Sequence, residues 1–145
     1  MKHVKKAIAL SGLLVLLTFS AALGQSDRQT IIYIPFNFTA GEKTFPAGKY
    51  VFERIWKNSD SVWVVRRKDN VGKAMLLTRP VRANETQEET KLVFHQYGDL
   101  YFLSEIWTAG DTMGREIQTS DRERGLDKAV AAKRVDHILT DRGGK

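Results

Sequence analysis

Apolar and polar residues alternate along much of the chain after residue 30. In the segment 31–38 (IIYIPFNF) four apolar side chains fall on one face of an extended backbone: Ile32, Ile34, Phe36 and Phe38. A period of two residues is typical of a half-buried strand. Pro35 falls on the other face and has no N–H to donate, so we expect this strand at a sheet edge or at a bulge.

Short segments of the same kind recur, separated by residues that favour turns. Strands are predicted over 49–56, 61–68 and 73–83, with turns between them, and the polar, acidic segment 84–90 (NETQEET) is predicted to be an exposed loop. Strands at regular short spacing indicate an all-β domain, mainly antiparallel. A small β-sandwich and a β-barrel meander fit this pattern equally well.

The segment 91–107 (KLVFHQYGDLYFLSEIW) predicts a β-hairpin. With Gly98-Asp99 as a two-residue type II′ turn, three cross-strand pairs follow: Tyr97 with Leu100, His95 with Phe102, and Phe94 with Leu103. One face would then carry His95, Val93, Phe102 and Ile106. The opposite face would carry Leu92, Phe94, Tyr101, Leu103 and Trp107. Both faces are largely apolar, so one is expected on the core and the other partly covered. The C-terminal segment is a candidate for this cover, and its helix would either dock on the sheet or project from it.

The period changes in the C-terminal segment. Ser120 and Glu123 fit the S-x-x-E capping box at a helix N-terminus. Apolar residues then recur at spacings of about 3.6 residues: Leu126, Ala129, Val130, Ile138 and Leu139. A helix is predicted over 121–139.

The first 24 residues form a different kind of segment. Three lysines precede an uncharged apolar run over 7–23, and Ala22-Leu23-Gly24 places small residues where a signal peptidase cleaves. We expect a signal peptide (1–24) cleaved after Gly24, a β domain (25–119) and a C-terminal helix and tail (120–145). The protein would then be exported, to the periplasm or the extracellular medium. The alternative is an uncleaved membrane anchor, because the apolar run is just long enough to span a bilayer.

Charge and cysteine content narrow the function further. Removing the three leader lysines lowers the formal net charge from +6 to +3, which gives little support for nucleic-acid binding. The chain has no cysteine, which excludes thiolate metal sites, cysteine nucleophiles and a lipoprotein anchor.

His95 is the main candidate for chemistry. Asp99 or Glu105 could serve as its acidic partner in a hydrolase, but Ser104 and Ser120 lie outside any G-x-S-x-G motif. A metal site would need three or four converging ligands, and no other histidine stands at a recognisable spacing. The favoured interpretation is a histidine that is hydrogen-bonded within a hairpin, with no catalytic residue, no metal and no cofactor.

Two groups of residues are weak candidates for binding. Arg66, Arg67 and Lys68 could form a patch for polyanions, and an aromatic face could hold a small ligand. The ligand-binding candidates are His95, Tyr97, Tyr101, Trp107 and Trp63. The alternative is that these residues are strand-end charges and sheet-building aromatics.

Four motifs resemble a family of small, uncharacterised exported β-rich proteins from soil bacteria. They are I-P-F-x-F at 34–38, G-x-x-x-x-P-A-G-x-Y at 41–50, K-L-V-F-x-x-Y-G-x-x-Y-F-L at 91–103 and I-W-x-x-G at 106–110. The resemblance implies a shared fold and carries no known activity.

The sequence favours an exported, non-catalytic binding or structural module of the bacterial envelope. Its partner would be a small apolar ligand, an envelope polysaccharide or an envelope protein, and nucleic acid is not expected. After cleavage of the signal peptide, the protein itself is not expected to be an integral membrane protein. Two alternatives are a hydrolase using His95 and a module that adds its edge near Pro35 to a partner's sheet.

Overall fold

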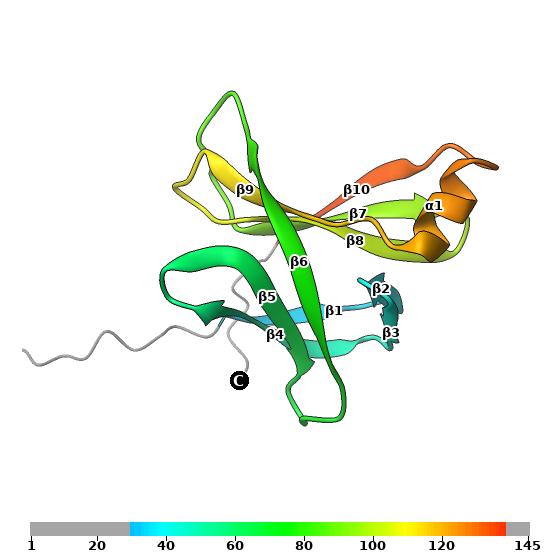
Figure 1. Ribbon diagram of the computed structural model, residues 1–145, viewed down its shortest axis with the longest axis horizontal. Helices are drawn as coiled ribbons and strands as arrows, with labels where there is room; N and C mark the ends of the chain where they lie inside the picture. Colours follow the sequence, from blue (N-terminus) through cyan, green and yellow to red (C-terminus); the bar gives the residue numbers. More distant parts are fainter. Residues whose placement is uncertain (1–29, 139–145) are drawn as a thin grey trace, which may run out of the picture.

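Ten strands and one short helix make up the part of the chain that the computed structural model describes, residues 30–138 (Figure 1). The predicted signal peptide and its cleavage site lie outside these residues. The elements are β1 (Thr30–Ile34), β2 (Phe38–Ala40), β3 (Lys43–Phe45), β4 (Gly48–Trp56), β5 (Ser59–Arg67), β6 (Lys73–Arg82), β7 (Lys91–Tyr97), β8 (Leu100–Trp107), β9 (Met113–Ile117), α1 (Asp121–Asp127) and β10 (Lys133–Ile138). The predicted all-β class with one C-terminal helix is confirmed.

The strands form one mixed, mostly antiparallel sheet that bends into two facing layers. The strand order runs β1-β4-β5-β6-β9-β8, and β8 continues to β7 and β10 on one side and to β2 and β3 on the other. The long strand β6 belongs to both layers, because residues 73–77 pair with β5 and residues 78–82 pair with β9. Figure 1 shows β6 crossing from the β1-β4-β5 layer to the β7-β8-β9-β10 layer.

The sheet is not closed into a barrel. Among the described residues β1 pairs only with β4, and β10 pairs only with β7. These two edges nevertheless meet, because His137 Nε2 of β10 lies 3.0 Å from the carbonyl oxygen of Tyr33 in β1. In a closed barrel, backbone hydrogen bonds would join β1 to β10. Here a side-chain hydrogen bond from His137 joins these two edges instead.

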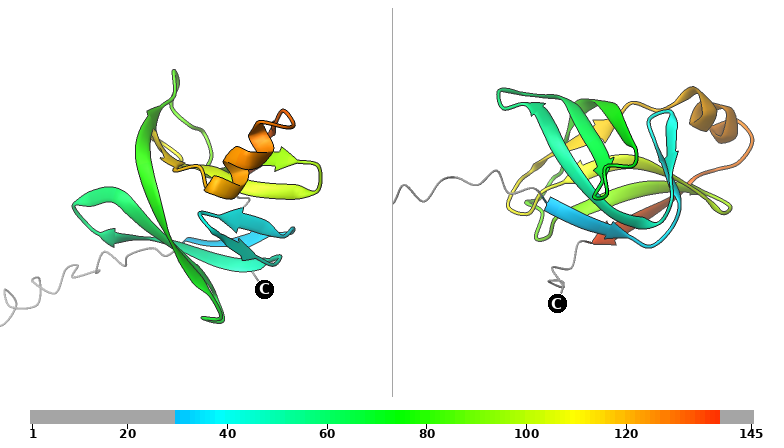
Figure 2. Two further views of the ribbon diagram at one scale, coloured as in Figure 1. Left: turned by 45° about the vertical axis from the view of Figure 1, so that its right-hand side comes forward. Right: turned by 90° about the horizontal axis from the view of Figure 1, so that it is seen from below.

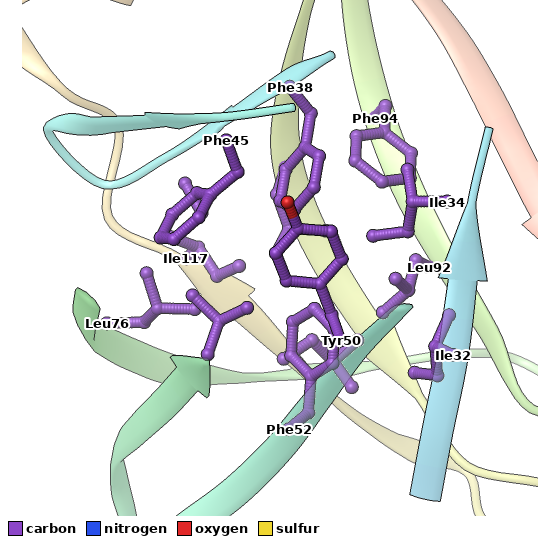
Figure 3. Close-up of a cluster of buried hydrophobic side chains, with 14 residues drawn as sticks. Ile32, Ile34, Phe38, Phe45, Tyr50, Phe52, Leu76, Leu92, Phe94 and Ile117 are labelled. Atoms are coloured by element: carbon purple, nitrogen blue, oxygen red, sulfur yellow. The ribbon is translucent and has the colours of Figure 1, made fainter. Parts of the chain in front are cut away.

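The core lies between the two layers. Tyr50 points into its centre and meets Phe38 and Phe45 edge-on, at ring-centroid distances of 5.0 and 5.6 Å (Figure 3). Tyr50 also donates a hydrogen bond to the carbonyl of Pro46, so its hydroxyl is satisfied inside the core. From the facing β7-β8-β9-β10 layer, Leu92 and Phe94 of β7 enter the same core.

The strand predicted over 31–38 is wrong as a single element. β1 ends at Ile34, the chain turns at Pro35, and β2 begins at Phe38 in the other layer, beside β8. Pro35 has no N–H for a ladder, and its ring disfavours a regular continuation. The predicted edge position of β1 is confirmed.

The predicted hairpin turn and its three cross-strand pairs are confirmed, and Gly98 has the positive φ (60°) that a type II′ turn needs. The predicted faces are wrong beyond Leu103. Val93 pairs with Glu105 and Phe94 with Leu103, so Ser104 is an extra residue in β8. This bulge reverses the alternation. Ile106 therefore enters the core, and Trp107 leaves it.

The helix predicted over 121–139 is wrong after residue 127. Residues 133–138 form β10, which pairs with β7 along six residues. The free edge of β7 offers this segment a full ladder, whereas a helix here would bury little beyond Leu126. The segment 113–117, for which no strand is predicted above, is strand β9.

Trp107 packs directly against Gly114, and this contact generates a prediction. A Cβ at position 114 would lie 2.6 Å from two ring carbons of Trp107, so Gly114→Ala must displace the indole. We expect the free energy of unfolding to fall by about 1–3 kcal/mol, measured by urea denaturation.

Gly125→Ala is the matched control, because its Cβ would meet nothing within 4 Å. In α1 this change should stabilise the protein by up to about 1 kcal/mol. An unchanged urea midpoint for Gly114→Ala would contradict the tight Trp107 contact.

Candidate functional site

Polar side chains converge between the β7-β8 hairpin and α1. They form what we call the His95 cluster: His95, Tyr97, Ser104, Glu123 and Asp127. The cluster lies on the hairpin face that is turned away from the core, and α1 packs over it (Figure 2). Of the two arrangements that the sequence leaves open for the helix, docking on the sheet and projection from it, the structure shows docking.

His95 bridges the hairpin and the helix through both ring nitrogens. Its Nδ1 lies 2.7 Å from Glu123 Oε1, and its Nε2 lies 3.2 Å from Ser104 Oγ. Ser104 reaches this position because it is the extra residue of the β8 bulge. The carboxylate accepts from Nδ1–H, which leaves Nε2 to face the serine hydroxyl.

Glu123 is placed by the helix N-terminus. Ser120 is the N-cap, and its hydroxyl accepts a hydrogen bond from the Glu123 backbone N–H at 3.2 Å. In a complete capping box the Glu123 carboxylate would return to the Ser120 N–H. Here it turns to His95 instead, so the cap positions one buried acid against the histidine.

The buried carboxylate changes the acid–base behaviour of its neighbours. The hydrogen bond to Glu123 raises the pKa of His95, although burial opposes the shift. Burial, together with the charges of Glu123 and Asp127, raises the pKa of Tyr97 to about 12. The Tyr97 hydroxyl therefore stays protonated and donates toward both acids, at 3.3 and 3.4 Å.

A second polar group lies beside the His95 cluster. Arg134 of β10 donates two hydrogen bonds to Glu105, at 2.6 and 2.9 Å, and the Trp107 indole donates a third, at 2.6 Å. Burial alone would raise the pKa of Glu105, but the three hydrogen bonds outweigh it and lower that pKa. Glu105 is thus engaged in tying β8 to β10.

The Ser104–His95–Glu123 geometry has the atom order of a hydrolase triad, with Ser Oγ on Nε2 and the carboxylate on Nδ1. The acid is Glu123, in place of the Asp99 or Glu105 suggested by the sequence. Ser104 is only 6% exposed, and it lies in the middle of β8. A hydroxyl this buried is not open to a substrate carbonyl, so the arrangement fits a structural tie better than an open active site.

The aromatic candidates are mostly occupied by packing. Tyr97 and Trp107 are buried, and Tyr101 stacks on Phe36 with ring centroids 4.2 Å apart. Trp63 packs against the core, and its indole N–H is buried with no hydrogen-bond partner in the described part of the chain. These rings do not form a shared platform on the surface.

The three predicted cations do not form one patch by themselves. Arg66 pairs with Glu53 at 2.8 Å, and Arg67 pairs with Asp69 at 3.0 Å. Arg66 and Arg67 also point to opposite sides of β5, as successive strand residues must. Lys68 is exposed at the end of the strand.

The topology creates a surface that is not among the candidates predicted from the sequence. The side of the β1-β4-β5-β6 layer turned away from the core, which we call the outer face, carries Ile31, Tyr33, Lys49, Val51, Glu53, Val62, Val64, Arg66, Lys73, Met75 and Leu77. Four of its apolar side chains are 50–65% exposed: Ile31, Tyr33, Met75 and Leu77. In the sequence, this face could have been recognised from apolar residues that occur on both faces of the same strands, where only the core face needs them.

Comparisons with protein-family models, curated proteins and solved structures find no significant match. The resemblance to small exported proteins therefore rests on the motifs quoted above. No helix within residues 30–138 is long and apolar enough to cross a membrane. Within the same residues, no three His, Asp or Glu side chains are grouped as a metal site would need.

The raised pKa of His95 generates a pH prediction. The ion pair stabilises the fold fully below the unfolded-state pKa of about 6.5, and the contribution is lost as the pH rises through the raised folded-state pKa. His95→Gln should therefore cost about 1–2 kcal/mol at about pH 6 and clearly less at about pH 9. Urea denaturation at both pH values measures this difference.

Glu123→Gln and the double variant His95→Gln/Glu123→Gln complete a double-mutant cycle, which measures the coupling free energy between the two residues. The coupling between positions 95 and 123 should be present at the lower pH and shrink at the higher one. A coupling free energy that is independent of pH would contradict a stabilising charge interaction between His95 and Glu123.

Proposed function

We propose that the protein is an exported, non-catalytic binding module of the bacterial envelope and that its outer face is the binding surface. The observation that carries the proposal is the exposure of four large apolar side chains on one side of one layer. Ile31 and Tyr33 lie on β1, and Met75 and Leu77 lie on β6. Between the two pairs lie Val51, which is buried, the partly buried Val62 and Val64, and the ion pair of Arg66 with Glu53.

Scattered exposed apolar residues are ordinary, but two pairs of large exposed apolar side chains on one side of the same layer point to an interaction site. These residues alternate with the core positions on the same strands and point away from the core. Their apolar character therefore adds nothing to the packing of the core. Tyr50, Phe52, Val65 and Leu76 already fill the core side. A partner that covered the outer face would remove this surface from water, and each side chain would contribute on the order of 1 kcal/mol.

The edge of β1 offers a less suitable surface. A strand-adding partner would need the free backbone groups of β1, and the carbonyl of Tyr33 already accepts from His137. The outer face has no comparable obstruction among the described contacts of its apolar residues.

Binding through the outer face can be tested with the protein recovered after export. Wild-type protein should sediment with washed envelope particles of its host. Met75→Ser/Leu77→Ser should weaken the apparent affinity at least about tenfold, because two apolar contacts are lost.

Leu100→Ser/Val130→Ser is the matched control, since both residues are exposed apolar side chains away from the outer face. It should bind like wild type. Equal binding by the Met75/Leu77 variant and the wild type would overturn the outer face as the binding surface, and no sedimentation of wild type would overturn the envelope module.

One specific geometry favours a second candidate, a hydrolase built on Ser104, His95 and Glu123. If this candidate holds, hydrolysis of a small activated ester such as p-nitrophenyl acetate should vanish in Ser104→Ala, whose fold should be intact because only one hydroxyl is lost. Under the binding proposal, any slow ester hydrolysis should be the same in wild type and Ser104→Ala.

A further inference from the structure

Four lysines gather at the end of the β1-β4-β5-β6 layer that carries the β5-β6 turn. Lys49 of β4 lies opposite Lys68, whose backbone N–H donates to the Lys49 carbonyl at 2.9 Å. Lys73 lies opposite Arg66 in the β5-β6 register. Lys43 of β3 approaches from the core side, where its Nζ lies 5.7 Å from the centroid of the Phe45 ring, and donates to the Lys73 carbonyl at 3.3 Å. We call Lys43, Lys49, Lys68 and Lys73 the lysine group.

The charge of the lysine group is not neutralised within the described part of the chain. None of residues 30–138 places a carboxylate within ion-pairing distance of the four ammonium groups. The two nearest acids by register, Glu53 and Asp69, are already paired with Arg66 and Arg67. This end of the molecule therefore carries a concentrated positive charge on a chain of modest overall charge.

An apolar tip projects from the middle of this charge. The turn between β5 and β6 extends from the body of the molecule in Figure 1 and in the left view of Figure 2. Val71 stands in this turn between Lys68 and Lys73 and is 71% exposed. Asn70 and Gly72 take positive φ values (62° and 111°), and the Asn70 N–H bonds to the Arg67 carbonyl, so the tip has a defined shape.

The combination fits one kind of partner. A lipid–water interface offers anionic headgroups to lysines and, just below them, hydrocarbon to apolar side chains. Val71 at the tip and Met75, two residues beyond Lys73 on the same face, are placed to enter that hydrocarbon. An anionic polysaccharide would use the lysines but would leave Val71 and Met75 in water.

We propose that the β5-β6 turn, the lysine group and the adjoining outer face dock the protein on the surface of an anionic phospholipid bilayer. The inference rests on the proposed function and deepens it by naming the partner as lipid. Each lysine near such a surface contributes roughly a fivefold gain in affinity, so four of them with an apolar tip suffice for reversible, salt-sensitive attachment.

The test is co-sedimentation of the exported protein with vesicles of phosphatidylcholine, with and without phosphatidylglycerol. Wild type should bind only the vesicles that contain phosphatidylglycerol, and high KCl should release it, because salt screens exposed charges. Lys68→Glu/Lys73→Glu should weaken binding at least about tenfold. Val71→Ser should weaken it several-fold without changing the salt dependence.

Lys128→Glu/Lys133→Glu is the matched control, because it makes the same change in net charge on exposed residues near α1 and β10. It should bind within about twofold of wild type. Thermal melting of each variant checks that these exposed substitutions leave the fold intact.

Absence of binding to phosphatidylglycerol vesicles, or an equal loss in the control, would overturn the lipid proposal. If Met75→Ser/Leu77→Ser still reduced sedimentation with host envelopes in that case, the binding module would stand with a protein or polysaccharide partner. If wild type sedimented with neither, both proposals would fall.

Discussion

One extra residue in β8 determines much of this structure. The bulge at Ser104 reverses the alternation of side chains midway along the β7-β8 hairpin. Before it, Leu103 faces the core; after it, Ile106 does. The same shift turns Trp107 outward onto Gly114 and brings Ser104 beneath His95. A regular ladder would have put a tryptophan in the core and left the histidine without its second partner, so the bulge works as a structural feature of the fold.

Polar side chains on the face of the hairpin away from the core attach the C-terminal segment to it. Glu105 holds Arg134 of β10, and His95 holds Glu123 of α1. Arg122 adds a contact over the Phe102 ring, with its guanidinium carbon 6.0 Å from the ring centroid. A seven-residue helix would not be stable alone. It is ordered here because charged hydrogen bonds at buried or half-buried positions fix it to the hairpin, which explains a triad-like geometry without an open site.

The two layers therefore have different roles. The β7-β8-β9-β10 layer has both faces covered, one by the core and the other in part by α1. The β1-β4-β5-β6 layer has one covered face, and its other face combines exposed apolar side chains with lysines. Such a surface is costly to leave in water, and nothing in the internal packing accounts for it. This asymmetry is the physical basis for assigning binding to the outer face rather than to the aromatic residues of the hairpin.

The sequence by itself determined the local elements. Alternation located β4, β5, β6 and the hairpin strands to within one or two residues, because burial on one face requires a period of two. Gly98 predicted the tight turn, and Ser120 predicted the helix start, because both depend on backbone conformations within a few residues.

Only the tertiary structure decided what each element contacts. Residues 133–138 became a strand because β7 had a free edge, and no local pattern records a free edge. The sequence predicts Glu123 as a residue of the capping box, yet its carboxylate is hydrogen-bonded to His95, 28 positions away. The lysine group likewise comes from segments that are unrelated in sequence. Long-range strand pairing sets these neighbours, and its hydrogen bonds are made by backbone groups that every residue shares, so the side-chain pattern alone does not specify them.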